Sequence, residues 1–143
     1  MKNDAESRAA KHDISEVLVN YTMGIDRRDW ELFRSVFTTD VVADYEGIAT
    51  WNGVEEITEF MESAHAPMGH TLHRLTNISI DVDLDAGAAT AHSYVDANLM
   101  MPDGQTGAHA IGYYDDRLVH DDDEWRIAHR HYVGVRYQDI GAQ

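Results

Sequence analysis

The segment NISIDVDL, residues 77–84, alternates apolar and polar side chains, and the turn signal Asp85-Ala86-Gly87 follows it. A period of two places Ile78, Ile80 and Val82 on one face of a β-strand. Three further runs of strand character follow, at residues 88–101, 107–119 and 125–137. Turn residues separate them, Pro102-Asp103-Gly104 after the first and Asp121-Asp122-Asp123 after the second. From Pro67 onward the chain therefore predicts long antiparallel strands joined by hairpins.

Upstream of Pro67 the apolar residues recur with the period of an α-helix. The stripe Ile14, Val17, Leu18, Tyr21 and Ile25 predicts a first helix from about Glu6 to Gly24 or slightly beyond. Asp29 is a suitable N-cap for a second helix at residues 30–37, which Thr38-Thr39-Asp40 would close. A short strand is expected next, at residues 41–45.

A third helix is expected after a turn at Trp51-Asn52-Gly53, with Asn52 as its cap and Glu55 in the capping-box position. Its buried stripe would be Val54, Ile57, Phe60, Met61 and Ala64. Three helices followed by a meander of four strands predict one α+β domain covering residues 1–143. In this domain a strongly bent, mostly antiparallel sheet would wrap around the N-terminal helices.

Composition excludes several classes of function. Twenty-six Asp and Glu against eleven Lys and Arg give a net charge of −15, so nucleic acid and anionic membranes are not expected as partners. The absence of cysteine removes disulfides, thiol nucleophiles and thiolate metal sites. The polar start MKNDAESRAAKHD lacks the apolar core of a signal peptide, and no run of about eighteen apolar residues occurs. We therefore expect a cytoplasmic protein.

Asp26 conflicts with the local preferences of a helix. It lies at the C-terminal end of the first predicted helix, where the helix dipole disfavours a carboxylate by several tenths of a kcal/mol. Arg27 or Arg28 could neutralise it at the surface. Alternatively, a fixed carboxylate can accept the Nδ1 hydrogen of a histidine and leave Nε2 free as a general base.

Each predicted strand presents two faces of different character. The run at 88–101 has His92, Tyr94, Asp96 and Asn98 on one face and Ala91, Ser93, Val95, Ala97 and Leu99 on the other. The last run has Arg126, Arg130, Tyr132 and Arg136 opposite Trp125, Ile127, His129, His131, Val133 and Val135. The arginine face either lines a cavity or is solvated. The pattern His129-Arg130-His131 lacks a third ligand at a convincing spacing, so no metal site is expected.

Several short motifs follow one another in a recognisable order. They are Tyr21, Gly24-Ile25-Asp26-Arg27-Arg28-Asp29-Trp30, Leu32-Phe33, Phe37-Thr38-Thr39-Asp40, Asn52-Gly53 and His70-Thr71-Leu72-His73-Arg74-Leu75-Thr76-Asn77. Over nearly the whole chain this order resembles the SnoaL-like branch of the NTF2-like superfamily. Within that branch it is most similar to the group of scytalone dehydratase, bile-acid 7α-dehydratase and hexachlorocyclohexane dehydrochlorinase.

The resemblance implies a cone-shaped α+β barrel around one apolar pocket and a lyase that needs no cofactor. It implies that Asp26 and His73 form the family's Asp/His dyad and that Tyr21 is a pocket tyrosine. It also places Asp96 where the dehydratases carry a second carboxylate. Either Arg130 or Arg136 would be the arginine that reaches inward from the last strand.

These residues suit a β-elimination on a small hydrophobic alicyclic or aromatic molecule. A neutral imidazole, with a reference pKa of about 6.5, can take a proton from carbon, and Asp26 would stabilise the resulting imidazolium. Tyr21 could donate to a departing hydroxide or hold a carbonyl. Asp96, if buried, would have a raised pKa and act as an acid, while the arginine would offset negative charge. The expected pocket walls are Val17, Tyr45, Trp51, Phe60, Met61, Leu75 and Met100.

Two other functions fit the same scaffold. An isomerase or polyketide cyclase would share the proton abstraction but eject nothing. A non-catalytic ligand-binding protein, or an oxygenase small subunit, would have a pocket filled by side chains, or Asp26 and His73 too far apart to hydrogen bond. We also expect a homo-oligomer, preferably a trimer, with Trp125, Ile127, Val133, Val135 and Tyr137 as subunit contacts.

Overall fold

The computed structural model describes residues 2–141, so residues 1, 142 and 143 of the expected domain lie outside the described part. The elements are α1 (Lys2–Asp26), α2 (Trp30–Ser35), β1 (Phe37–Tyr45), β2 (Ala49–Asn52), α3 (Val54–His65), β3 (Thr71–Asp83), β4 (Ala88–Met100), β5 (Gly107–Asp121) and β6 (Glu124–Ile140). The predicted α+β class, with its three helices and its meander of long strands, is confirmed.

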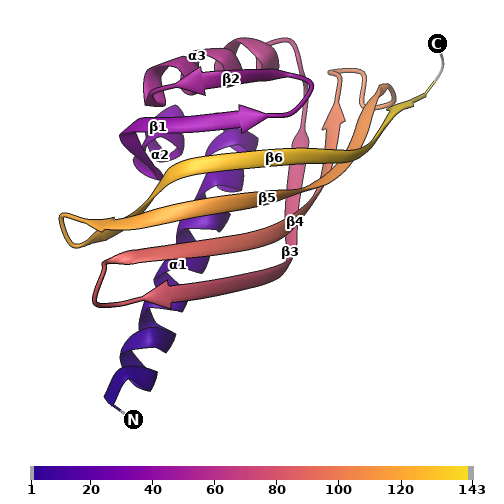
Figure 1. Ribbon diagram of the computed structural model, residues 1–143. Coiled ribbons are helices and arrows are strands. Elements are labelled where there is room, and N and C mark those ends of the chain that lie inside the picture. Colours follow the sequence, from indigo (N-terminus) through magenta and orange to yellow (C-terminus); the bar gives the residue numbers. More distant parts are fainter. Residues whose placement is uncertain (1, 142–143) are drawn as a thin grey trace.

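The six strands form one mixed sheet in the order β2-β1-β6-β5-β4-β3. Strand β1 runs parallel to β6, and the other pairings are antiparallel. Because β2 and β3 are edges, the sheet is curved but not closed. Figure 1 shows α1 crossing one face of strands β3 to β6, while α2 and α3 lie beside β1 and β2. Strands β3 to β6 bend at the end opposite the β3–β4 and β5–β6 hairpins, which produces a concave face towards the helices.

A β-bulge in β3 changes which side chains face the helices. The pairing with β4 shifts between Thr76 and Ser79, and Asn77 adopts a positive φ of 51°. Before the bulge His73 and Leu75 face inward, whereas Ile78 and the apolar residues that alternate after it face inward beyond the bulge. The predicted alternation is therefore correct from Ile78 onward. It reverses on the N-terminal side of Asn77, where His73 lies.

A second bulge, in β6, makes part of the predicted subunit interface wrong. Leu118 pairs with Ile127 and Arg117 with His129, so Ala128 is extra and the inward-facing parity changes there. Trp125 and Ile127 consequently lie in the core of the protein itself and are unavailable as subunit contacts. The other residues of that predicted set lie elsewhere: Val133 is half-buried, and Val135 and Tyr137 are exposed.

The segment between α1 and α3 differs from the prediction in three places. Residues 37–40 belong to β1 rather than to the end of the second helix, and Trp51 and Asn52 form part of β2 rather than a turn. Pairing of Trp51 with Ala43 outweighs the local turn signal. The N-cap of α3 is Gly53, and Glu56 rather than Glu55 reaches back to the Asn52 amide at 3.2 Å. The predicted Asp29 cap is confirmed by its bond from the Leu32 amide, 3.1 Å long.

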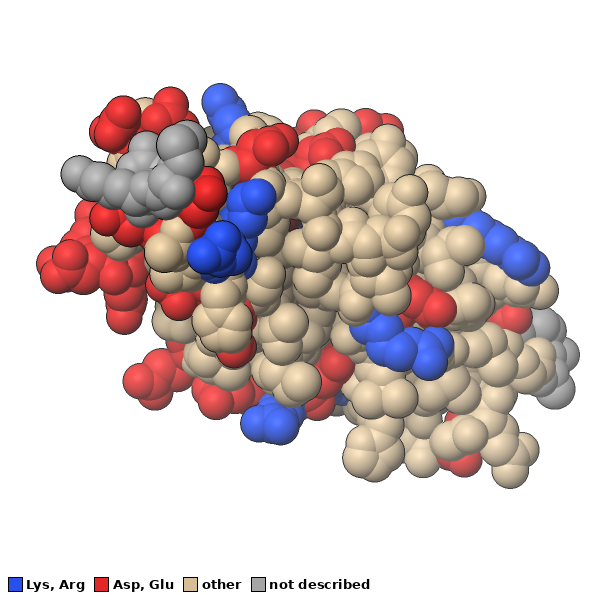
Figure 2. Space-filling model, turned by 90° about the horizontal axis from the view of Figure 1, so that it is seen from below, with Lys and Arg blue, Asp and Glu red and all other residues tan. Residues whose placement is uncertain are grey.

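Charge is distributed unevenly over the surface. Figure 2 shows Asp and Glu side chains crowded at the end of the molecule where α1 begins. Within residues 2–141, no helix combines the length and the apolar character that crossing a membrane requires.

Candidate active site

A cavity of about 340 Å³ lies between α1, α3 and the concave face of the sheet. Its walls consist of aromatic and aliphatic side chains, with two imidazoles and several tyrosines among them. The lining residues include Tyr21, Ile25, Tyr45, Trp51, Phe60, Met61, His65, His73, Val95, Leu99, Tyr114, Tyr132 and Tyr137. A concave, mostly apolar space with a few converging polar groups is the usual form of a small-molecule site.

Asp26 and His73 meet at the edge of this cavity. The Nδ1–H of His73 donates to Asp26 Oδ1 at 2.7 Å, and the backbone N–H of His73 donates to Asp26 Oδ2 at 2.8 Å. Their side chains are 9% and 15% exposed. Because the carboxylate can only accept, Nδ1 carries the hydrogen and Nε2 carries the lone pair. The non-catalytic alternative expected Asp26 and His73 to lie too far apart to hydrogen bond. The 2.7 Å between Nδ1 and Oδ1 is instead a normal hydrogen-bond distance.

The unfavourable position of Asp26 at the end of α1 is offset by its donors. Thr71 Oγ1 adds a third hydrogen bond to the carboxylate, at 2.9 Å. Arg28 does not neutralise the carboxylate directly. Instead, its guanidinium donates to the Ile25 carbonyl and to Thr71 Oγ1, both at 2.9 Å, and to the Gly69 carbonyl at 2.7 Å. Arg28 therefore satisfies the carbonyl end of α1 and ties it to the start of β3.

Replacing Thr71 with valine is expected to lower the free energy of unfolding by about 1.5–3 kcal/mol, because Thr71 is buried and donates to a charged acceptor. Thr76, an exposed residue of the same strand, provides the matched Thr76→Val control, with an expected change within about 0.5 kcal/mol. Urea denaturation measures both. Equal effects of the two substitutions would show that Thr71 does not hold Asp26.

A layer of tyrosines and one arginine lies beneath the cavity. The hydroxyls of Tyr21 and Tyr45 are 2.6 Å apart, and the Arg130 guanidinium lies 4.3 Å from the Tyr21 ring centroid and 3.7 Å from that of Tyr114. Burial raises the pKa of Tyr21 and Tyr45 well above the ordinary value, so both remain neutral phenols that can donate.

Of the two candidate arginines, Arg130 is the one that points inward. It is fully buried and forms a two-bond pair with Asp116, at 2.8 and 2.9 Å. Burial opposes its charge, but Asp116 outweighs burial and the pKa of Arg130 is raised. Its guanidinium stacks on the tyrosine rings and does not itself line the cavity. Arg136 lies on the surface, bonded to Gln138.

Asp96 does not lie in the cavity. Its face of β4 is the outer one, because Val95 and Ala97 face the core. The carboxylate pairs with His109 at 2.7 Å and with Arg74 at 3.3 Å. The hydrogen bond from His109 lowers the pKa of Asp96, the opposite of the expected rise. A role as a buried acid is therefore excluded by position.

The structure brings together only part of the predicted pocket wall. Tyr45, Trp51, Phe60 and Met61 line the cavity. Val17 and Leu75 pack against the hydrophobic core instead. Met100 does not line the cavity, because the neighbouring Leu99 takes the inward position on β4.

Residues 6–131 match the SnoaL-like domain. The chain belongs to the SnoaL-like domain family. An uncharacterized protein of Mycobacterium tuberculosis (strain ATCC 25618 / H37Rv) is 28% identical over 119 residues, which cover 82% of this chain and 80% of that protein.

Solved structures share the fold of this SnoaL-like chain. A candidate scytalone dehydratase from Novosphingobium aromaticivorans DSM 12444 superposes with a TM-score of 0.87 at 20% identity, covering 100% of this chain and 94% of that chain. A hexachlorocyclohexane dehydrochlorinase, LinA-type3 from Novosphingobium barchaimii LL02, gives 0.84 at 16% identity, covering 98% and 96%. At these identities the likeness establishes the NTF2-like fold.

The SnoaL-like cavity contains one imidazole that the sequence did not single out, His65 at the end of α3. It is 6% exposed, and its Nδ1–H donates to the Met61 carbonyl at 2.8 Å. Its Nε2 is buried and has no hydrogen-bond partner within residues 2–141. The helical spacing could have indicated that His65 is buried, because it follows the buried Met61 by four residues and so lies on the same face of the helix.

Burial of His65 predicts a pH dependence of stability. Burial lowers the pKa of His65, so between its folded and unfolded pKa values the unfolded chain binds more protons. The stability that neutral His65 contributes is complete above pH about 6.5, the ordinary pKa of a histidine. It is lost as the pH falls from there towards the lower pKa of the folded state. Denaturant titration at several pH values is expected to show a smaller loss of stability in acid for His65→Gln than for the wild type. Parallel pH profiles would contradict this.

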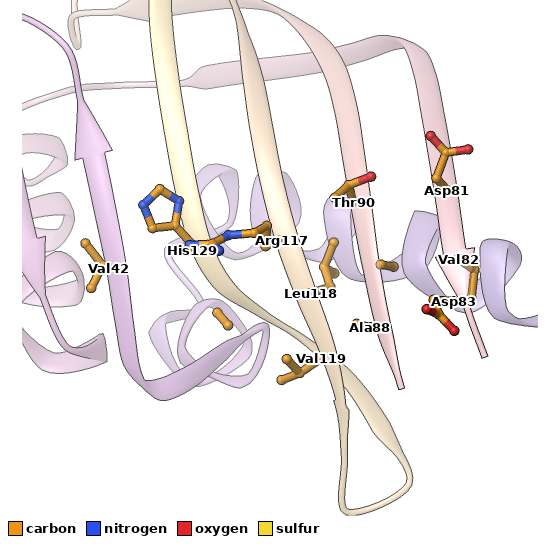
Figure 3. Close-up of a pocket in the computed structure, with 12 residues that line it drawn as sticks. Val42, Asp81, Val82, Asp83, Ala88, Thr90, Arg117, Leu118, Val119 and His129 are labelled. Atoms are coloured by element: carbon orange, nitrogen blue, oxygen red, sulfur yellow. The ribbon is translucent and has the colours of Figure 1, made fainter. Parts of the chain in front are cut away.

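A larger hollow, of about 660 Å³, lies on the opposite face of the sheet. Figure 3 shows Val42, Thr90, Arg117 and His129 on the strands in front, with α1 behind the sheet. Thr90 and Arg117 alternate with the buried Ala91 and Leu118, which places this hollow on the outer face. His73, bonded to Asp26, lines the interior cavity of the SnoaL-like domain, and we therefore take that cavity as the candidate active site.

Proposed function

We propose that this protein is a cofactor-free lyase that removes a proton from carbon and expels water or a related group from a small hydrophobic ring compound. The observation that carries the proposal is the 2.7 Å bond between His73 Nδ1 and Asp26 Oδ1 at an apolar cavity of about 340 Å³. The names of the structural neighbours, a dehydratase and a dehydrochlorinase, support the same reaction class.

The proposed step starts at His73 Nε2, whose lone pair takes a proton from the carbon next to an electron-withdrawing group. Asp26 stabilises the imidazolium that forms. The electron pair of the broken C–H bond becomes the new double bond, and the bond to the leaving group breaks. A departing hydroxide takes the proton that His73 Nε2 has just accepted and leaves as water, which returns His73 to its neutral form.

The tyrosine layer supplies donors for the oxygen that gains charge in this step. The Tyr21 hydroxyl is hydrogen bonded to the hydroxyls of Tyr45 and Tyr114, so these two bonds use two of the three hydroxyl hydrogens and one remains available to a substrate oxygen. The buried Arg130, stacked on Tyr21, adds positive potential behind that position. An isomerase or cyclase would use the same base and the same donors but would lack the leaving group.

A ring ketone with a β-hydroxyl, 3-hydroxycyclohexanone, tests the proposal in deuterated buffer. The proposal predicts a product lighter by one water, at a rate above that of buffer alone. A product that keeps its hydroxyl oxygen and has gained deuterium would replace elimination by isomerase-type chemistry. Binding of the ketone with neither exchange nor elimination would overturn catalysis and favour a ligand-binding function.

A further inference from the structure

Two imidazoles lie next to each other in the wall of the cavity. The ring centroids of His65 and His73 are 6.1 Å apart. In each ring Nδ1 donates to an oxygen that can only accept, the Met61 carbonyl for His65 and the Asp26 carboxylate for His73. Both neutral rings therefore carry their lone pair on Nε2. The proposed reaction uses the lone pair of His73 and leaves that of His65 without a role.

The lone pair of His65 lacks a donor in its surroundings. Its Nε2 is one of the few buried side-chain atoms without a partner in the described part of the chain. Its ring packs against Trp30, with centroids 6.3 Å apart, and lines the cavity. Buried acceptors are nearly always completed by a donor, and a ligand can supply one when the acceptor belongs to a cavity wall.

We propose that His65 Nε2 accepts a hydrogen bond from a hydroxyl group of the substrate, so that the substrate is a hydroxylated, uncharged ring compound. Halogens and carbonyl oxygens accept hydrogen bonds and cannot satisfy this atom. An ammonium group could donate, but the mostly apolar walls of the cavity disfavour burial of a cation. A hydroxyl supplies the donor without bringing a charge into the cavity.

This assignment rests on the proposed function only in calling the bound molecule a substrate. It makes His65 a specificity-determining residue that separates hydroxylated rings from halogenated ones. It also places the bound hydroxyl in the neighbourhood of His73, because the two ring centroids are 6.1 Å apart. The binding preference can be measured without any turnover.

Cyclohexanol and chlorocyclohexane form a matched pair of probes for the test. Dissociation constants would be measured for the full-length wild type, for His65→Phe and for His65→Gln, which keeps an acceptor. His70→Phe is the control, because His70 is exposed and not a lining residue. His65→Phe is expected to weaken cyclohexanol about tenfold, as for loss of one hydrogen bond, and to leave chlorocyclohexane within about threefold. His65→Gln should lose less, and His70→Phe should match the wild type.

Retained binding of chlorocyclohexane shows that a variant is folded. A cyclohexanol affinity unchanged in His65→Phe would overturn the proposal, as would equal weakening of both probes. In ¹⁵N-labelled wild type, cyclohexanol should shift the unprotonated Nε2 resonance of His65, and chlorocyclohexane should not. These readouts measure binding alone. A negative result in them would not contradict proton abstraction by His73, and a negative elimination assay would not contradict the binding results.

Discussion

Replacing His73 with alanine is expected to lower kcat/KM for elimination by roughly two to four orders of magnitude, since it removes the general base. Asp26→Asn should cost a similar factor. An amide can donate to the ring as well as accept from it, so the tautomer that leaves the lone pair on Nε2 is no longer enforced. Steady-state kinetics with 3-hydroxycyclohexanone would measure both, and circular dichroism would establish that the variants are folded.

A matched control is provided by a second histidine–carboxylate pair on the outside of the sheet. His92 Nδ1 lies 2.6 Å from Asp115 Oδ1, and both side chains are substantially exposed. His92→Ala should therefore leave kcat/KM unchanged. A loss in His92→Ala comparable with that in His73→Ala would mean that the effect arises from general destabilisation rather than from the dyad.

Asp116→Ala is expected to cause the largest loss of stability, about 3–5 kcal/mol, because it leaves the fully buried Arg130 guanidinium without its partner. Urea denaturation would measure the loss. Replacing both members, as in Asp116→Leu with Arg130→Met, should recover much of it, since no uncompensated charge then remains in the core.

The exposed pair Arg126 and Glu124 serves as the comparison. Its atoms lie 2.6 Å apart, yet the Glu124 side chain is mostly exposed, so Glu124→Ala should cost less than about 1 kcal/mol. A cost for Asp116→Ala as small as that for Glu124→Ala would contradict the role of the buried pair. It would also mean that Arg130 reaches water in the native protein.

The secondary structure followed well from residue periodicity where the pattern is long. Strands β4, β5 and β6 and their hairpins were predicted to within a few residues, because turn residues mark their ends. The bulges were not predicted, because polar and apolar residues are mixed on both faces of the strand next to each bulge, so the change of parity is not marked clearly in the sequence. Arg130 and Arg136 show the consequence. They have the same parity in the sequence, but a register shift after Gly134 places them on opposite faces.

The candidate site was predicted through the family resemblance rather than through local chemistry. Asp26 and His73 are separated by 47 positions, and nothing in their own segments states that they meet. The contact depends on Arg28 and Thr71, which join the end of α1 to the start of β3. Asp96 was misplaced because alternation identifies two faces of a strand without saying which of them is inner.

The central claim, proton abstraction by His73 in the interior cavity, is tested most directly by a ketone that cannot eliminate. Cyclohexanone in deuterated buffer reports removal of the proton next to its carbonyl through incorporation of deuterium, independently of any leaving group. The wild type should accelerate this exchange over buffer, and His73→Ala should not exceed the buffer rate. Exchange that is equally fast with the wild type and with His73→Ala would contradict the assignment of His73 as the base.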